Sequence, residues 1–121
     1  MANSIPYEFV FDYLPNGVIV KKMFGMHYIY WGKKIMLILR KRDNLPEMNG
    51  IWVATSKEHH ESLKSNIHEL GPFFIEGDER HGNWLLIPAD AEDLEEATIK
   101  VCELISHGDP RIGKVTEKAP L

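Results

Sequence analysis

Five consecutive apolar residues, Ile35 to Leu39, constrain the fold of this chain more than any other stretch. A strand that lacks polar alternation is covered on both faces, so this run predicts the central strand of a sheet. Glycine at the first central position of the turn Gly32-Lys33 predicts a hairpin to a preceding strand over His27 to Trp31. β-Branched residues after an Asn-Gly turn predict one more strand, Val18 to Phe24.

Caps and apolar spacing predict the remaining helices and strands. Helices are expected over Ile5 to Leu14, after a capping box formed by Thr55 and Glu58, and after a cap at Asp90. Strands are expected over residues 51–54, 73–76 and 83–87. The order α-β-β-β-β-α-β-β-α, with short hairpin links, predicts class α+β: two layers, a mostly antiparallel sheet of about six strands, and three helices.

The chain has the length of one domain, because 121 residues supply a single core and are too few for two ordinary domains. We expect this domain to cover residues 1–108, since Gly108 is a natural stop for the last helix. Residues 109–121 carry little to bury and are expected to form a flexible tail. The polar, turn-rich residues 40–50 predict a loop of unusual length, and such loops are often functional.

Composition bears on where the protein works. No apolar run approaches the roughly 20 residues that a membrane helix needs, and residues 1–6 lack the pattern of a secretion signal. A single cysteine, Cys102, excludes an internal disulfide and fits a reducing compartment. A cytoplasmic protein without membrane contact is therefore expected.

Charge is divided unevenly along the chain. Residues 1–50 hold seven Lys and Arg against four Asp and Glu, whereas residues 51–121 hold seven against fourteen. This division suits a basic hairpin that meets an acidic partner, or two copies that meet head to tail; a mixed, solvated surface is the plainer interpretation.

Side chains that could support catalysis or metal binding form no recognisable pattern in the sequence. None of the six histidines has the i, i+4 spacing of a helical zinc site, and the acids around Asp93 suit a solvated helix face. Cys102 lies far from a helix N-terminus and is interpreted as a structural thiol. We therefore expect no metal, no cofactor and no enzyme; an enzyme would need a pocket that joins His27, His59 or His60 to a carboxylate.

Several short motifs resemble the N-terminal domain of the TfoX/Sxy competence regulators and, more loosely, the YjbR-like proteins. They are Lys22-Met23-Phe24-Gly25 before an aromatic strand, Gly71-Pro72-Phe73 before a later strand, and Ile87-Pro88 before an acidic helix. The resemblance covers roughly residues 5–107 and implies a bacterial α+β domain with an antiparallel sheet, a regulatory role and no defined active site. Met26 stands where the family usually has a second glycine, and the helical C-terminal domain of full-length competence regulators is absent.

Two functions follow as hypotheses from the hairpin and the resemblance. The first is a non-enzymatic module that acts through protein contacts, with itself as a homodimer or with another protein. The second is a nucleic-acid-binding accessory, in which aromatic residues stack bases beside basic ones. The candidate interaction surface for either comprises Lys22, Phe24, Gly25, Tyr28, Tyr30, Trp31, Lys33, Lys34, Arg40, Lys41 and Arg42.

Overall fold

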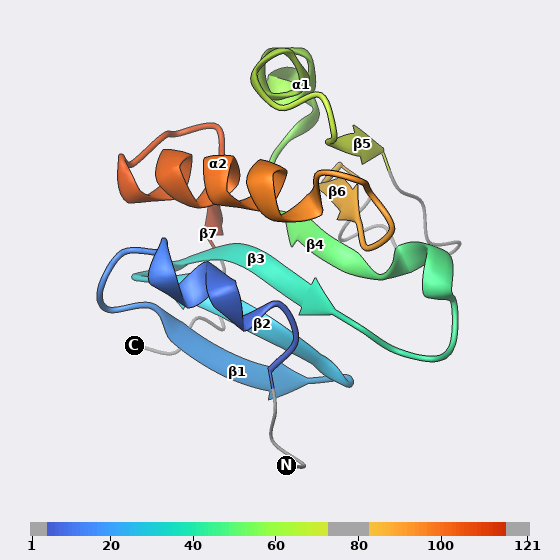
Figure 1. Cartoon of the computed structure of the whole chain (residues 1–121). Helices are drawn as coiled ribbons and strands as arrows, with labels where there is room; N and C mark the ends of the chain where they lie inside the picture. Colours follow the sequence, from blue (N-terminus) through green and yellow to red (C-terminus); the bar gives the residue numbers. More distant parts are fainter. Residues whose placement is uncertain (1–4, 73–82, 116–121) are drawn as a thin grey trace.

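A single antiparallel sheet organises the protein, whose computed structural model describes residues 5–72 and 83–115 (Figure 1). Six strands lie side by side in the order β1-β2-β3-β4-β6-β5, and a seventh, β7, pairs with β3. Every one of these pairs is antiparallel. The strands are β1 (Ile19–Met23), β2 (Met26–Trp31), β3 (Lys34–Arg40), β4 (Gly50–Val53), β5 (Gly71–Pro72), β6 (Leu85–Pro88) and β7 (Lys114–Val115).

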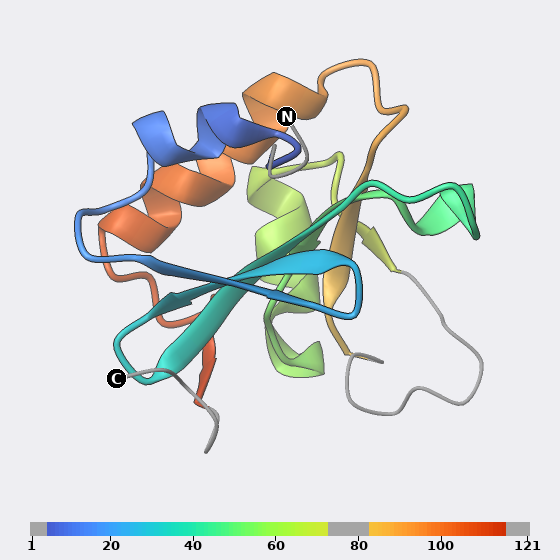
Figure 2. The same cartoon turned by 90° about the horizontal axis from the view of Figure 1, so that it is seen from below.

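The described residues form two α-helices, α1 (His60–Asn66) and α2 (Leu94–Ser106). Three short 3-10 helices accompany them: η1 (Glu8–Asp12), η2 (Pro46–Met48) and η3 (Lys57–His59). Figures 1 and 2 show α2 and η1 side by side over one face of the sheet. The predicted class, α+β with a mostly antiparallel sheet, is confirmed. None of the described helices is long and apolar enough to cross a membrane.

The third helix expected, Ile5 to Leu14, is instead the five-residue 3-10 helix η1. Tyr7 immediately before it has a φ of 56°, in the left-handed region, so an α-helix cannot run through this position. No side chain caps the start of η1, and only Val10 is fully buried from it. The predicted cap, Ser4, lies outside the described residues.

The strand predicted to be central is confirmed as the middle of the sheet. Leu37, Ile38 and Leu39 are all 0% exposed, and β3 pairs with β2 on one side and with β4 and β7 on the other. The side chains of β3 enter two separate cores, Met36, Leu37 and Leu39 the one under the helices, and Ile35 and Ile38 the one on the opposite face. Their alternation is interrupted at Met36, where the pairing with β2 shifts its register. The second core includes Tyr28, Tyr30, Ile38, Trp52 and Trp84.

Two predicted helix caps are wrong. Ser56, not Thr55, stands at the N-cap position of η3, and no side-chain cap bond forms there or at the start of α1. Thr55 is 1% exposed, and its hydroxyl donates 2.6 Å to the carbonyl of Arg111. Helix α2 begins at Leu94 with Asp93, not Asp90, at the N-cap position. Apolar residues at helical spacing predict one buried face for each helix. Leu63, Ile67 and Leu70 are buried on the α1 side; on α2, Ala97, Val101 and Ile105 are buried, while Leu94 and Leu104 are half-buried.

Residues 109–115 do not form the expected flexible tail, because they contain a buried side chain and a strand that joins the sheet. Ile112 is 2% exposed, and β7 pairs with Lys34 and Ile35 of β3. The Arg111 guanidinium donates to both carboxylate oxygens of Asp109 and to Asn66 Oδ1. Residues 116–121, and the strand predicted over 73–76 with its turn, lie outside the described residues.

Candidate functional site

The structure separates the predicted interaction surface into three parts. Tyr28 and Tyr30, on the middle of β2, are 7% and 3% exposed and belong to the second core. Trp31, Lys33 and Lys34 lie at the β2–β3 turn. The remaining six residues lie at the opposite end of these strands, at the β1–β2 turn and where β3 ends: Lys22, Phe24, Gly25, Arg40, Lys41 and Arg42.

Arg40 is a structural residue of the loop that follows β3. It is 4% exposed, although it was predicted to lie on the surface. Its guanidinium donates to the carbonyls of Asn44 and Leu45, at 2.9 and 2.8 Å, and to Asn49 Oδ1 at 2.7 Å. Burial lowers the pKa of Arg40 and the nearby Arg42 charge lowers it further. The three acceptors take three of the five N–H donors of its guanidinium. The buried Arg40 side chain therefore holds the loop that follows β3 in place at Asn44, Leu45 and Asn49.

Asn49 links Arg40 to Arg42 through hydrogen bonds of its side-chain amide. Its amide group accepts from the Arg42 N–H at 2.9 Å and donates to the Arg42 carbonyl at 2.8 Å. The Arg42 guanidinium then donates 3.0 Å to the carbonyl of Phe24, in the β1–β2 turn. A chain of hydrogen bonds thus runs from the buried end of β3 to an exposed turn.

The β1–β2 turn holds an aromatic residue in an unfavourable conformation. Met23 pairs with Met26, so Phe24 and Gly25 are its two central residues, with φ values of 54° and 74°. Positive φ at both positions is the pattern of a type I′ turn, in which asparagine and glycine are favoured. Phe24 is 69% exposed, and its ring meets Tyr28 at a centroid distance of 6.5 Å. The fold does not require a large apolar side chain at this position.

Backbone strain gathers around the same segment. Only three non-glycine residues of the described chain have positive φ, namely Tyr7, Phe24 and Leu45. Each is hydrogen-bonded to residues 40–42: the Tyr7 hydroxyl donates to the Arg40 carbonyl, and the other two carbonyls accept from Arg42 and Arg40. Left-handed residues of this kind cluster at functional sites. We call the segment 40–49 with the turn 24–25 the strained corner.

A basic hollow of about 410 Å³ adjoins the strained corner. Among the described residues, its lining contains three basic side chains and no carboxylate: Ile5, Pro6, Lys22, Gly25, His27 and Lys41. His27 is 9% exposed, and its Nδ1 is buried without a hydrogen-bond partner. Burial lowers the pKa of His27, and the charge of Lys22 lowers it further. The hollow is therefore suited to an anionic group and lacks the carboxylate that a His27-based catalytic pair would need.

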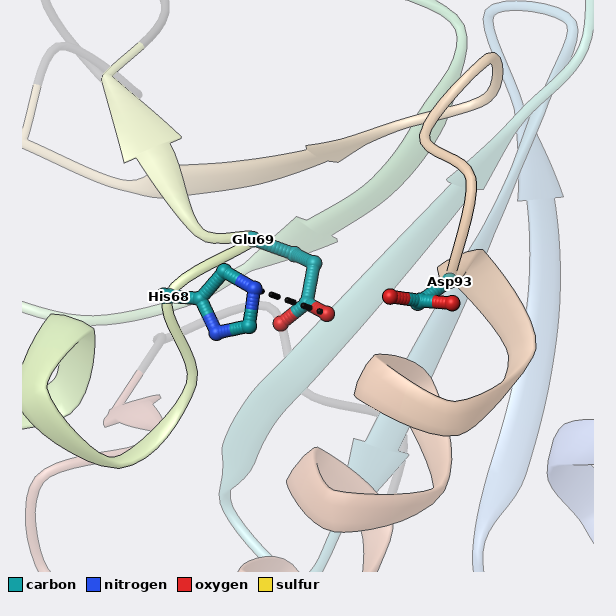
Figure 3. A group of neighbouring side chains, drawn as sticks. All are labelled: His68, Glu69 and Asp93. Atoms are coloured by element: carbon teal, nitrogen blue, oxygen red, sulfur yellow. Dashed lines mark ion pairs between the residues drawn. The ribbon is translucent and has the colours of Figure 1, made fainter.

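A second group of ionisable side chains, not predicted from the sequence, lies between the segment after α1 and the start of α2 (Figure 3). His68 and Glu69 follow α1, and Asp93 precedes α2. One ligand atom from each residue, a ring nitrogen of His68 and a carboxylate oxygen of Glu69 and of Asp93, lies within 4.8 Å of the other two. The sequence shows only the adjacent pair His68-Glu69. Asp93 lies 24 residues after Glu69, and only the fold brings it close to them.

Cys102 is a core residue, as predicted. It is 0% exposed, and burial together with the neighbouring Glu103 charge raises its pKa to about 12. A thiol with so high a pKa supplies almost no thiolate near neutral pH.

Comparisons of the chain with protein-family models, with curated proteins and with solved structures find no match. The resemblance to TfoX/Sxy proteins stays a prediction.

Proposed function

We propose that this protein is a non-enzymatic, cytoplasmic binding module that holds an acidic segment of a partner protein at the strained corner. The observation that carries the proposal is Phe24, which is 69% exposed in a left-handed conformation that Arg42 fixes through the Phe24 carbonyl. Exposed aromatic side chains on rigid supports are common anchors of protein interfaces. A regulatory role of the TfoX type is compatible with this activity.

The charges around Phe24 favour an acidic partner. Lys21, Lys22, Lys41 and Arg42 are all exposed. The basic hollow beside them is lined by Lys22, Lys41 and the ring of His27. A carboxylate from the partner would enter the hollow while Phe24 packs against an apolar side chain. Opposite charges across an interface chiefly raise the association rate and select the partner.

The structure favours a protein partner over nucleic acid. The nucleic-acid hypothesis relied on Tyr28 and Tyr30 as a stacking surface, but both are buried in the second core. Lys33 and Lys34, at the far turn, are separated from the basic residues of the strained corner by the length of β2. Phe24 alone is left as an exposed aromatic residue beside the basic ones.

Peptide display tests the proposal. A library of random peptides is selected on the wild-type protein, and the selected peptides are titrated against Phe24→Asn and Lys41→Glu. We expect acidic peptides with an apolar residue, and a loss of affinity of about tenfold or more in both variants. Tyr13→Asn is the matched control, because Tyr13 is 41% exposed and lies beside the far end of α2, where its carbonyl accepts from Ser106.

Peptides without acidic residues, or affinities that Phe24→Asn leaves unchanged, would contradict the proposal. Single- and double-stranded DNA are titrated in parallel. DNA binding that falls steeply with salt and survives Phe24→Asn would replace the proposal by the nucleic-acid hypothesis. A dimer seen by light scattering that Phe24→Asn dissociates would make a second copy the occupant.

A further inference from the structure

One imidazole and two carboxylates converge where the segment after α1 meets the start of α2 (Figure 3). His68 Nε2 lies 3.4 Å from Glu69 Oε2, and the nearest Asp93 oxygen completes a group within 4.8 Å. None of the three residues belongs to the strained corner or to the described lining of the basic hollow. They therefore call for an explanation of their own.

Glu69 is the first of two unusual residues in this group. Its side chain is only 10% exposed, and its Oε1 is buried with no hydrogen-bond partner. An ionised carboxylate withdrawn from water is costly unless positive charge or donors replace the lost hydration. The His68 ring approaches the other oxygen, Oε2, and is itself 82% exposed. One acceptor of Glu69 is therefore left without a partner inside the protein.

Asp93 is the second unusual residue, because it occupies a helix N-cap and does not cap. Aspartate at this position normally accepts a hydrogen bond from the first turn of the helix. No such side-chain bond forms at the start of α2, and the Asp93 carboxylate faces Glu69 instead (Figure 3). Two carboxylates that face each other repel unless a cation lies between them.

We propose that His68, Glu69 and Asp93 bind a divalent transition-metal cation of the zinc class. Imidazole nitrogen together with carboxylate oxygen suits such a cation, whereas Ca²⁺ prefers six or more oxygens. Two ligands of a tetrahedral zinc ion, each about 2.0–2.1 Å from it, are roughly 3.4 Å apart. His68 Nε2 and Glu69 Oε2 already have this separation, 3.4 Å. Asp93 is exposed and makes no cap bond, so no hydrogen bond to the helix has to break for its carboxylate to join them.

The cation acts as a clip between two parts of the fold. It joins the segment that follows α1 to the first turn of α2, and water fills the fourth coordination position. Because a folded chain presents the three ligands together and an unfolded chain does not, binding stabilises the native state. This role is independent of the proposed partner binding.

Calorimetric titration of Zn²⁺ into the purified chain tests the site. We expect one ion per chain, and affinity lower by about tenfold or more in His68→Ala and in Asp93→Asn. His107→Ala and Asp90→Asn are matched controls, because both residues are exposed and lie outside the group. We also expect Zn²⁺ to raise the melting temperature of the wild type and of both controls, but not of the two ligand variants.

Three results would overturn the proposal. Zn²⁺ affinity that is the same in Asp93→Asn as in the wild type would mean adventitious binding to surface histidines. Ca²⁺ that binds as tightly as Zn²⁺ would make the cation class wrong. No binding below about 1 mM would leave His68 and Glu69 as a simple ion pair. Each result is read on variants whose cooperative thermal unfolding shows that they are folded.

Discussion

The two turns that bound β2 are both two-residue hairpin turns, but they differ in backbone conformation. Gly32 and Lys33 are central in the β2–β3 turn, and there the positive φ, 64°, falls on a glycine. In the β1–β2 turn it falls on Phe24 as well as on Gly25. The β2–β3 turn contains only what a chain needs to reverse direction between two strands. The β1–β2 turn requires positive φ at both central residues, one of them Phe24, and adds an exposed aromatic ring and a hydrogen bond from Arg42. Backbone strain of this kind, held in place by its surroundings, is typical of functional sites.

The largest effect expected on this comparison comes from Arg40, on which the strained corner depends. Arg40→Met would leave the carbonyls of Asn44 and Leu45 and the Asn49 side chain without their shared donor. We expect the free energy of unfolding in urea to fall by about 2–4 kcal/mol. Lys33→Met, at the other turn, should change it by less than about 0.5 kcal/mol. Equal effects of the two substitutions would show that the corner has no special support.

A smaller pair of effects, opposite in sign, should distinguish the turns directly. Phe24→Asn replaces a residue that resists positive φ by one that tolerates it, so we expect a gain of about 0.5 kcal/mol in stability. Gly32→Ala adds a Cβ that meets nothing within 4 Å but must adopt a φ of 64°. We expect a loss of about 1 kcal/mol from strain alone. Chemical denaturation measures both, and a loss on Phe24→Asn would mean that the ring stabilises the fold.

The smallest effect expected is the pH dependence due to His27. Its pKa in the folded chain is lowered from 6.5, mainly by burial. Below pH 6.5 the unfolded chain binds a proton that the folded chain resists, so stability should fall as the pH decreases through this value. His27→Gln should remove this part of the pH dependence when urea unfolding is compared at pH 5.5 and 7.5. His107→Gln is the control, and a profile unchanged by His27→Gln would contradict the assignment.

Local patterns predicted the parts of the fold that depend on local chemistry. The Gly32-Lys33 turn was predictable because the glycine marks a left-handed position. The central strand was predictable because Ile35 to Leu39 has no polar face, and the stripe of α2 because its spacing is helical. Local patterns could not predict which elements cover each face of the sheet. Tyr28 and Tyr30 were placed on the surface for this reason, yet they fill the second core.

The candidate sites were predicted less well, because distant segments create them. Phe24 and the basic residues around it were identified, but Arg40 was misread since nothing in the sequence shows that a loop arginine turns inward. His68, Glu69 and Asp93 meet only after Leu70 and Leu94 have packed into the core. Thr55 was predicted to cap a helix, but it precedes the N-cap residue Ser56, and its hydroxyl donates to the carbonyl of Arg111, 56 residues later.

The pairing of β7 with β3 has a consequence for how the chain assembles. Beyond the stretch that β4 covers, the start of β3 finds its partner only in Lys114 and Val115, and Gly113 also donates to the carbonyl of Ala54. During synthesis from the N-terminus, the middle strand therefore keeps part of one edge open until these residues emerge. Such an edge can pair with another chain, and contacts so distant in sequence form slowly. Nascent chains halted before residue 114 should be the form most prone to aggregate.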